Sequence, residues 1–257
     1  MVQQRSLRHE YDLYVESEIE RYKDSIPRNK LLAIGDEAVA SLESQAQMGF
    51  SELLLVEEVD RIIRKRLRVP AYDAWRRRRI RQLEKFRDPL HWGLSPAAPL
   101  VRAIAKQDNA RVVVAGATDS SSALFLAANG CQVTALDGDE DVVERVMHAA
   151  LAAGLAERVH GVVAGLGSYS PEGPINGVVC TADALSGLSA SERRRVINVL
   201  QGATRDGGVH LVQTIVAGTS LLTLEELRSS YRGWDISVEY SAGLGLESSF
   251  LARKGPA

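Results

Sequence analysis

The feature that most constrains the fold is an alternation of short apolar runs with helical segments, which begins near residue 111. Strand-like runs cover residues 111–115, 132–136, 158–163, 177–180 and 208–215, and helical patterns cover residues 121–129, 139–153 and 190–203. The strand-like runs are almost continuously apolar, which is typical of a parallel sheet with helices on both faces. The pattern predicts a doubly wound α/β sheet.

Two further strand-like runs follow a helical pattern over residues 223–231. They are Trp234–Tyr240 and Ser248–Arg253, and the Gly-containing segment Ser241–Gly245 connects them. A short connection of this kind favours antiparallel pairing. We therefore expect a seven-stranded, mostly parallel sheet with an antiparallel hairpin of residues 234–253 at its edge.

The first ninety residues show helical periodicity and no strand pattern. Apolar side chains recur every three or four residues between Tyr11 and Tyr22, which is one helical stripe. Similar stripes predict helices near residues 31–42, 51–67 and 72–87, and Pro27 and Pro70 mark breaks between helices. We expect an α-helical N-terminal region, residues 1–90, followed by an α/β domain, residues 91–257.

The overall composition is that of an ordinary globular protein, with 45% hydrophobic residues and a net charge of −2. Total charge therefore indicates neither a nucleic acid nor a membrane as partner. The two cysteines, Cys131 and Cys180, are far apart in apolar contexts, and we expect reduced, buried thiols. No apolar run approaches the ~20 residues of a membrane helix, so the expected location is the cytoplasm.

The segment 61–87 holds twelve Lys and Arg residues against only Asp73 and Glu84. In one interpretation it is a solvated face whose cations pair with the acids of the preceding helices, namely Glu16, Glu18, Glu20, Glu52, Glu57 and Glu58. In the other it is a basic patch for nucleic acid or another polyanion. Because Arg76–Arg79 are consecutive, they point all around one helical turn and cannot all face one partner. We favour the solvated face.

The stretch VVVAGATDSSSALFLAANGCQVTALD resembles the first strand–turn–helix–strand unit of class I S-adenosylmethionine-dependent methyltransferases. RDGGVHLVQTIV resembles that family's Pro-Gly-Gly turn into its fifth strand, with Asp206 in place of the proline, and EELRSSYRGWDISVEY and SSFLARK resemble the end of its sheet. The pattern is similar to the small tellurite-resistance-type methyltransferases and covers roughly residues 91–254. It implies that S-adenosylmethionine lies across the carboxyl ends of the strands.

The resemblance implies a cofactor site lined by Gly116, Ala117, Asp137 and Thr181. Asp137 ends the second strand, where the family keeps an acid for the two ribose hydroxyls, and a carboxylate can accept hydrogen bonds from both. Alternatively, Asp137 is a loop residue that starts the next helix. In the segment DPLHWGL, Trp92 is either part of a lid over the entrance or a packing residue that joins the helical region to the sheet.

Several positions depart from the family pattern. Neutral residues replace family acids at Val114, Gly165 and Asn176, and the turn from Gly116 to Ser120 has Thr118 and Ser120 at two glycine positions. Asp119, within that turn, would either cap the following helix or bind the amine of the cofactor. Together, the departures indicate that cofactor binding is weakened, altered or absent.

Three functions are compatible with these patterns. The first is a methyltransferase whose acceptor, a small molecule or a protein, is unknown; such transfer depends mainly on positioning and desolvation, so no catalytic residue is assigned. The second is a catalytically inactive methyltransferase fold that acts as a scaffold, with a protein partner or a second copy bound through the N-terminal helices. The third is a nucleic-acid binder or modifier that uses residues 61–87. We rank them in this order and expect no metal.

Overall fold

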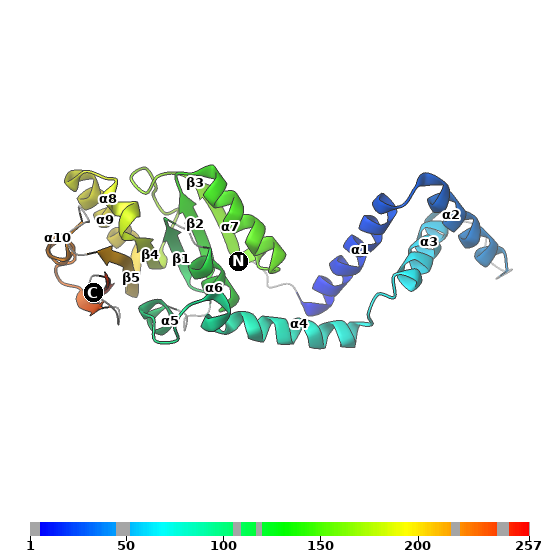
Figure 1. The fold of residues 1–257 in the computed structure, drawn as a ribbon, viewed down its shortest axis with the longest axis horizontal. Coiled ribbons are helices and arrows are strands. Elements are labelled where there is room, and N and C mark those ends of the chain that lie inside the picture. The colour runs from blue at the N-terminus through cyan, green and yellow to red at the C-terminus, as the bar shows by residue number, and fades with distance from the viewer. Residues whose placement is uncertain are drawn as a thin grey trace. The chain divides into compact units, whose positions relative to one another are not determined.

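The computed structural model describes residues 6–44, 52–104, 109–116, 120–216, 222–240 and 247–256. The chain divides into two compact units, Met1–Gln82 and Leu83–Ala257. The described parts of the first unit are helical, and the second unit contains the sheet (Figure 1).

Four helices account for most of the N-terminal unit: α1 (Leu7–Ser25), α2 (Arg28–Glu43), α3 (Glu52–Arg66) and α4 (Tyr72–Arg87), the last of which continues into the second unit. The α1 helix begins at Ser6, whose side chain accepts a hydrogen bond from the backbone N–H of His9. The apolar stripes of these helices form one core, in which Tyr11, Ile34 and Ile63 are almost completely buried. This burial explains why the N-terminal stretches are helical: each stripe covers its neighbours.

The second unit contains a seven-stranded sheet with the order β3-β2-β1-β4-β5-β7-β6. The strands are β1 (Arg111–Ala115), β2 (Gln132–Asp137), β3 (Val159–Val163), β4 (Ile175–Thr181), β5 (Thr204–Val216), β6 (Asp235–Tyr240) and β7 (Glu247–Arg253). The first five are parallel, whereas β7 pairs antiparallel with both β5 and β6. The predicted sheet and its antiparallel closing hairpin are confirmed.

Helices cover both faces of this sheet (Figure 1). The described helical segments of the unit, beyond the end of α4, are η1 (Pro89–Trp92), α5 (Pro99–Ala103), α6 (Ser121–Ala128), α7 (Glu140–Ala152), η2 (Ala156–Arg158), α8 (Ala182–Ser186), α9 (Ala190–Ala203) and α10 (Leu224–Ser230). One apolar core lies between the sheet and the helices α6 and α7, and includes Phe125. A second core lies under α8, α9 and α10, and includes Leu185, Leu200 and Leu227. The central strands β1 and β4 are thus buried on both sides, whereas β3 at the edge of the sheet is partly exposed.

The structure corrects the expected start of the fifth strand. It begins at Thr204, not Gly208, and the pairing with β4 shifts register between Ile175 and Gly177. The glycines of the RDGG segment lie in this irregularity: Gly207 has a φ of +74°, and a Cβ on Gly208 would collide with the Arg205 carbonyl oxygen. The family-like turn is therefore a bulge inside a strand, which only glycine permits at these two positions.

Both cysteines are buried free thiols, as expected. Burial raises the pKa of the Cys180 thiol to about 12, so this group stays protonated and unreactive. None of the helices in the described ranges combines the length and the apolar character needed to cross a membrane.

Candidate cofactor site

The strand order reverses between β1 and β4, which is where doubly wound sheets bind ligands, at the carboxyl ends of the strands. Ala115 of β1 lies opposite Leu136 of β2 on one side and Cys180 of β4 on the other. The next residue of each strand therefore emerges at the same edge. These residues are Gly116, Asp137 and Thr181, and the structure brings these three predicted site residues together.

Gly116 and Thr181 are in direct contact. Gly116 has a φ of +70°, and its N–H donates to the carbonyl oxygen of Leu136 over 3.1 Å. A Cβ on Gly116 would collide with the hydroxyl of Thr181 and would lie 3.0 Å from the Cβ of Ala184. The Thr181 hydroxyl is held there as the N-cap of α8, where it accepts a hydrogen bond from the backbone N–H of Ala184. The contact of the α8 residue Ala184 with this site was not predicted from the sequence.

Asp137 uses one of its two carboxylate oxygens to stabilise the loop after β2. Its Oδ1 accepts a hydrogen bond of 3.0 Å from the backbone N–H of Asp139, and Asp139 in turn caps α7. Its other oxygen, Oδ2, accepts none from the described residues. An ionised carboxylate has about four lone-pair positions, so the loop role and a ligand role are compatible. This contact agrees with the alternative that Asp137 is a loop residue before the next helix, and Asp139 is the residue that caps α7.

Beyond Asp137, the ends of the paired strands β2 and β3 are followed by two glycines that bring backbone close to backbone. Gly138 and Gly165 face each other here, and a Cβ on Gly138 would lie 3.9 Å from the Cα of Gly165. A Cβ on Gly165 would meet no atom within 4 Å. The position at which the family often keeps an acid for the adenine amino group thus opens onto free space.

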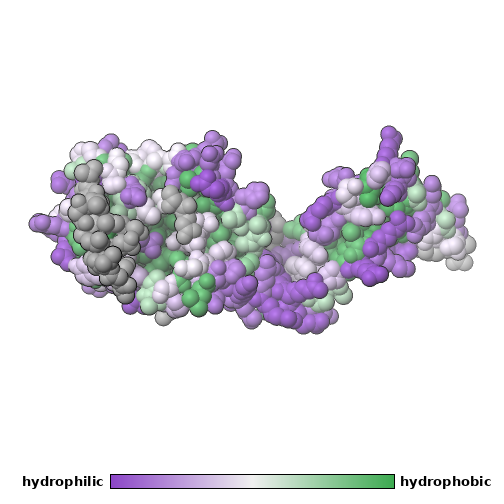
Figure 2. Space-filling model, in the orientation of Figure 1, coloured by the Kyte–Doolittle hydropathy of each residue, from purple (hydrophilic) through white to green (hydrophobic). Residues whose placement is uncertain are grey.

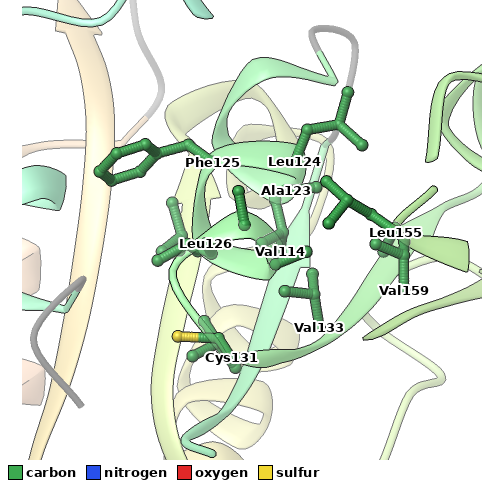
Figure 3. Close-up of a cluster of buried hydrophobic side chains, with 14 of the residues drawn as sticks. Val114, Ala123, Leu124, Phe125, Leu126, Cys131, Val133, Leu155 and Val159 are labelled. Carbon is green, nitrogen blue, oxygen red and sulfur yellow. The ribbon is translucent and has the colours of Figure 1, made fainter. Parts of the chain in front are cut away.

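Val114, by contrast, fills its position with packing. It is only 4% exposed and lies in the core between β1 and α6, where Figure 3 shows it near Ala123 and Val133. A carboxylate here would be enclosed by apolar groups, at a large desolvation cost. The position at which the family has an acid is therefore part of the hydrophobic core in this chain.

Asn176 does not belong to this edge of the sheet. Its Oδ1 accepts a hydrogen bond of 3.0 Å from the backbone N–H of Arg111, the first residue of β1. Five residues of extended chain, about 16 Å, separate it from Thr181. Its replacement of a family acid therefore does not bear on the carboxyl-end site.

Trp92 packs away from the three clustered residues. Its indole Nε1 donates to the carbonyl oxygen of Phe86 over 2.6 Å, and the two rings lie 5.4 Å apart. The neighbouring Arg87 carbonyl accepts from the side chain of Asn129, at the end of α6 that is remote from Gly116. This placement supports the packing interpretation of Trp92 over the lid interpretation.

Two predicted site residues, Ala117 and Asp119, lie outside the described residues. Within the described ranges, no three His, Cys, Asp or Glu side chains gather in a way that could hold a metal ion.

A buried polar chain lies on the other side of β4, on β5 and the segment after α10. The Tyr231 hydroxyl lies 2.8 Å from His210 Nδ1, and His210 Nε2 lies 2.7 Å from the Thr204 hydroxyl. Thr204 donates its own proton to the carbonyl oxygen of Leu200, so Nε2 must donate to Thr204 and Nδ1 must accept from Tyr231. Burial lowers the pKa of His210 to about 3, with a smaller contribution from Lys254. This chain is neutral, fully satisfied and structural.

A scan against protein-family models finds no match, and a search of curated proteins finds none either. Among solved structures, a putative O-methyltransferase from Nostoc punctiforme superposes with a TM-score of 0.53 at 12% identity, covering 67% of this chain and 60% of that one. The N-methyltransferase NodS from Bradyrhizobium japonicum gives 0.51 at 11% identity, covering 63% and 100%. TehB from Haemophilus influenzae gives 0.50 at 17% identity, covering 60% of this chain.

The second unit has the methyltransferase fold. The sheet order and the antiparallel β7 agree with this similarity, which at such low identity concerns the fold alone. The chain spans 61% of the length of the Haemophilus influenzae TehB chain.

Proposed function

We propose that the second unit binds S-adenosylmethionine weakly and that the chain is an S-adenosylmethionine-dependent methyltransferase-like protein with an unidentified methyl acceptor. One observation carries the proposal: Asp137 follows β2 next to Gly116 at the reversal point of the sheet, and its Oδ2 accepts no hydrogen bond from the residues that the structure describes. The similarity to TehB supports the narrower likeness to tellurite-resistance-type enzymes as part of this proposal.

The residues at this edge would bind two parts of the cofactor, its ribose and its methionine part. Asp137 would accept hydrogen bonds from the ribose hydroxyls, and the backbone at Gly116 and Ala117 would pass close to the methionine part. Asp119 would attract the amine, and Thr181 would line the same end. When bound, the cofactor supplies an electrophilic methyl group on a sulfonium, and the protein's task is to position it and exclude water.

Binding is expected to be weak for two structural reasons. The Thr181 hydroxyl fills the space beside Gly116, and positions 138 and 165, at the ends of β2 and β3, are glycines, which carry no side chain that could contact an adenine ring or its amino group. We expect a dissociation constant on the order of 100 µM, which corresponds to about −5.5 kcal/mol.

Calorimetric titration with S-adenosylmethionine and S-adenosylhomocysteine tests the proposal. The Asp137→Ala variant should bind more than about tenfold more weakly, because a hydrogen bond to a charged acceptor contributes about 1.5–3 kcal/mol. Glu144→Ala, which removes an exposed carboxylate from α7, is the matched control and should bind as the unchanged protein does. Equal affinity for all three proteins would remove Asp137 from the site, and micromolar binding would contradict the expected weakness.

The burial of Val114 in the α6 core favours a second function, an inactive methyltransferase fold that acts as a scaffold. In this alternative the helical unit holds a protein partner or a second copy of the chain. It predicts no heat of binding with either ligand at millimolar concentration, together with association of the full chain in sedimentation.

A further inference from the structure

The cations of residues 61–87 divide into a paired and an unpaired set. On α3, Arg61 pairs with Glu58, and Arg66 pairs with Glu37 of α2. On α4, Arg79 is held by Glu10 of α1, with 3.1 Å between its Nε and the carboxylate. Part of the segment is therefore neutralised, but among the acids expected as partners only Glu58 is seen in such a pair within the described residues, and Glu37 and Glu10 were not foreseen.

This pairing with carboxylates does not extend to the outer side of α4. Arg77, Arg78, Arg81 and Lys85, here called the α4 basic face, are all exposed, and none has a carboxylate partner among the residues that the structure describes. With about 100° of rotation per helical residue, these four side chains lie within an arc of about 100°. Figure 2 shows a continuous hydrophilic surface along this helix.

The opposite side of α4 fixes the orientation of this face. Trp75 stacks on Tyr14 with 6.1 Å between ring centroids, and the Arg79 side chain is only 14% exposed in its pair with Glu10. These anchors belong to the helical unit, so α4 cannot turn its basic face inward without breaking them. Four like charges are thus held together facing solvent, with only Asp73 and Glu84 as acids on the same helix, and a bound anion would relieve their repulsion.

The chemistry of the face selects one class of partner. Three of its four cations are arginines, whose planar guanidinium groups bind phosphate oxygens in pairs. Its arc holds no large apolar side chain, which a membrane-surface helix needs, and no aromatic ring, on which single-stranded bases stack. We propose that the α4 basic face binds the phosphate backbone of a double-stranded nucleic acid, without reading its sequence.

This binding has a characteristic dependence on salt. Four phosphate contacts predict a slope of about −3.6 for the logarithm of the association constant against the logarithm of salt concentration. Affinity should therefore fall roughly 150-fold between 50 and 200 mM salt. Two duplexes of unrelated sequence should bind equally, because contacts to phosphate carry no sequence information.

The experiment uses the full chain and the fluorescence anisotropy of a labelled duplex DNA of about 20 base pairs. The variant Arg77→Gln, Arg78→Gln, Arg81→Gln should bind at least tenfold more weakly at 50 mM salt and lose about 2.7 from the slope. The matched control, Arg145→Gln, Arg194→Gln, Arg228→Gln, removes the same charge from exposed positions of the other unit and should bind as the unchanged protein does. A charge-preserving variant, with lysine at 77, 78 and 81, should keep most of the affinity.

Each remaining outcome overturns the proposal. Equal losses in the two glutamine variants would mean that only total charge matters. Equal or tighter binding to the matching single strand, to phosphatidylserine vesicles or to polyglutamate would assign the face to another partner. No binding at 50 mM salt and 50 µM protein would leave the face a solvated one. Circular dichroism should show unchanged helix content in every variant, since all the substituted side chains are exposed.

Discussion

The hydroxyl of Thr181 occupies the space in which a side chain on Gly116 would begin. The two residues lie 65 positions apart in the sequence and meet because β1 and β4 are neighbours. Two features therefore require glycine at position 116: its positive φ and the close approach of Thr181. The same approach narrows the edge at which a cofactor would bind.

The Gly116→Ala substitution should reduce the free energy of unfolding by about 2–4 kcal/mol. A left-handed conformation costs a non-glycine residue about 1–2 kcal/mol, and the collision with Thr181 adds the rest. In a Thr181→Ala background, which itself loses an N-cap worth about 1 kcal/mol, the same change should cost less, because the collision with the hydroxyl is gone and only the left-handed conformation and the 3.0 Å approach to the Ala184 Cβ remain. Urea unfolding of the four proteins measures this coupling. A Gly116→Ala cost that is identical in both backgrounds would mean that the contact is not tight.

Gly165→Asp should strengthen binding of adenosine-containing ligands. A Cβ at this position meets open space, so the carboxylate can be added without a collision and can accept from an adenine amino group. We expect about a tenfold gain in affinity for S-adenosylhomocysteine in calorimetry. Val114→Asp, which restores a family acid inside the core, should instead destabilise the fold by more than about 3 kcal/mol. Unaltered affinity in a folded Gly165→Asp protein would place adenine elsewhere.

The Thr204–His210–Tyr231 chain predicts a loss of stability in mild acid. Because burial lowers the pKa of His210 to about 3, the unfolded chain takes up the proton first, near its ordinary pKa of about 6.5. The contribution of His210 is thus fully present above pH 6.5 and is lost as the pH falls from about 6.5 toward 3, by up to about 1.4 kcal/mol per pH unit. Urea unfolding between pH 7 and 5 should show a shallower decline in His210→Gln than in the unchanged protein. His148→Gln, an exposed histidine on α7, should decline as steeply as the unchanged protein.

Much of the sheet could be predicted because its signals are local. The Val-rich run Arg111–Ala115 and the helical pattern over Ala190–Ala203 end where the structure ends β1 and α9. The α8 helix could not be foreseen, since five residues are too few to show a period. The bulge in β5 was also missed, because a Gly-Gly pair before an apolar run is equally typical of a turn.

Residues of the candidate site that directly follow a strand could be predicted from the sequence. Contacts that depend on how strands or helices pair could not. Asp137 and Gly116 follow apolar runs directly, so their common edge follows from a parallel sheet. The place of Asn176 at the opposite edge also follows, because it precedes the apolar run 177–180, whereas its hydrogen bond with the Arg111 N–H depends on the pairing of β1 with β4. The ion pair of Arg79 could not be predicted from the sequence either. Its partner Glu10 lies 69 positions away, and only the packing of α1 on α4 brings the two together.

The place of β7 between β5 and β6 has a consequence for synthesis on the ribosome. A nascent chain that has emerged only as far as β6 has made every other strand, yet it lacks the one that both β5 and β6 pair with. Until residues 247–253 leave the exit tunnel, the long apolar β5 presents an open edge to any other extended chain. Translation at about 5–20 residues per second makes that interval brief, and a stall within it would expose a template for aggregation.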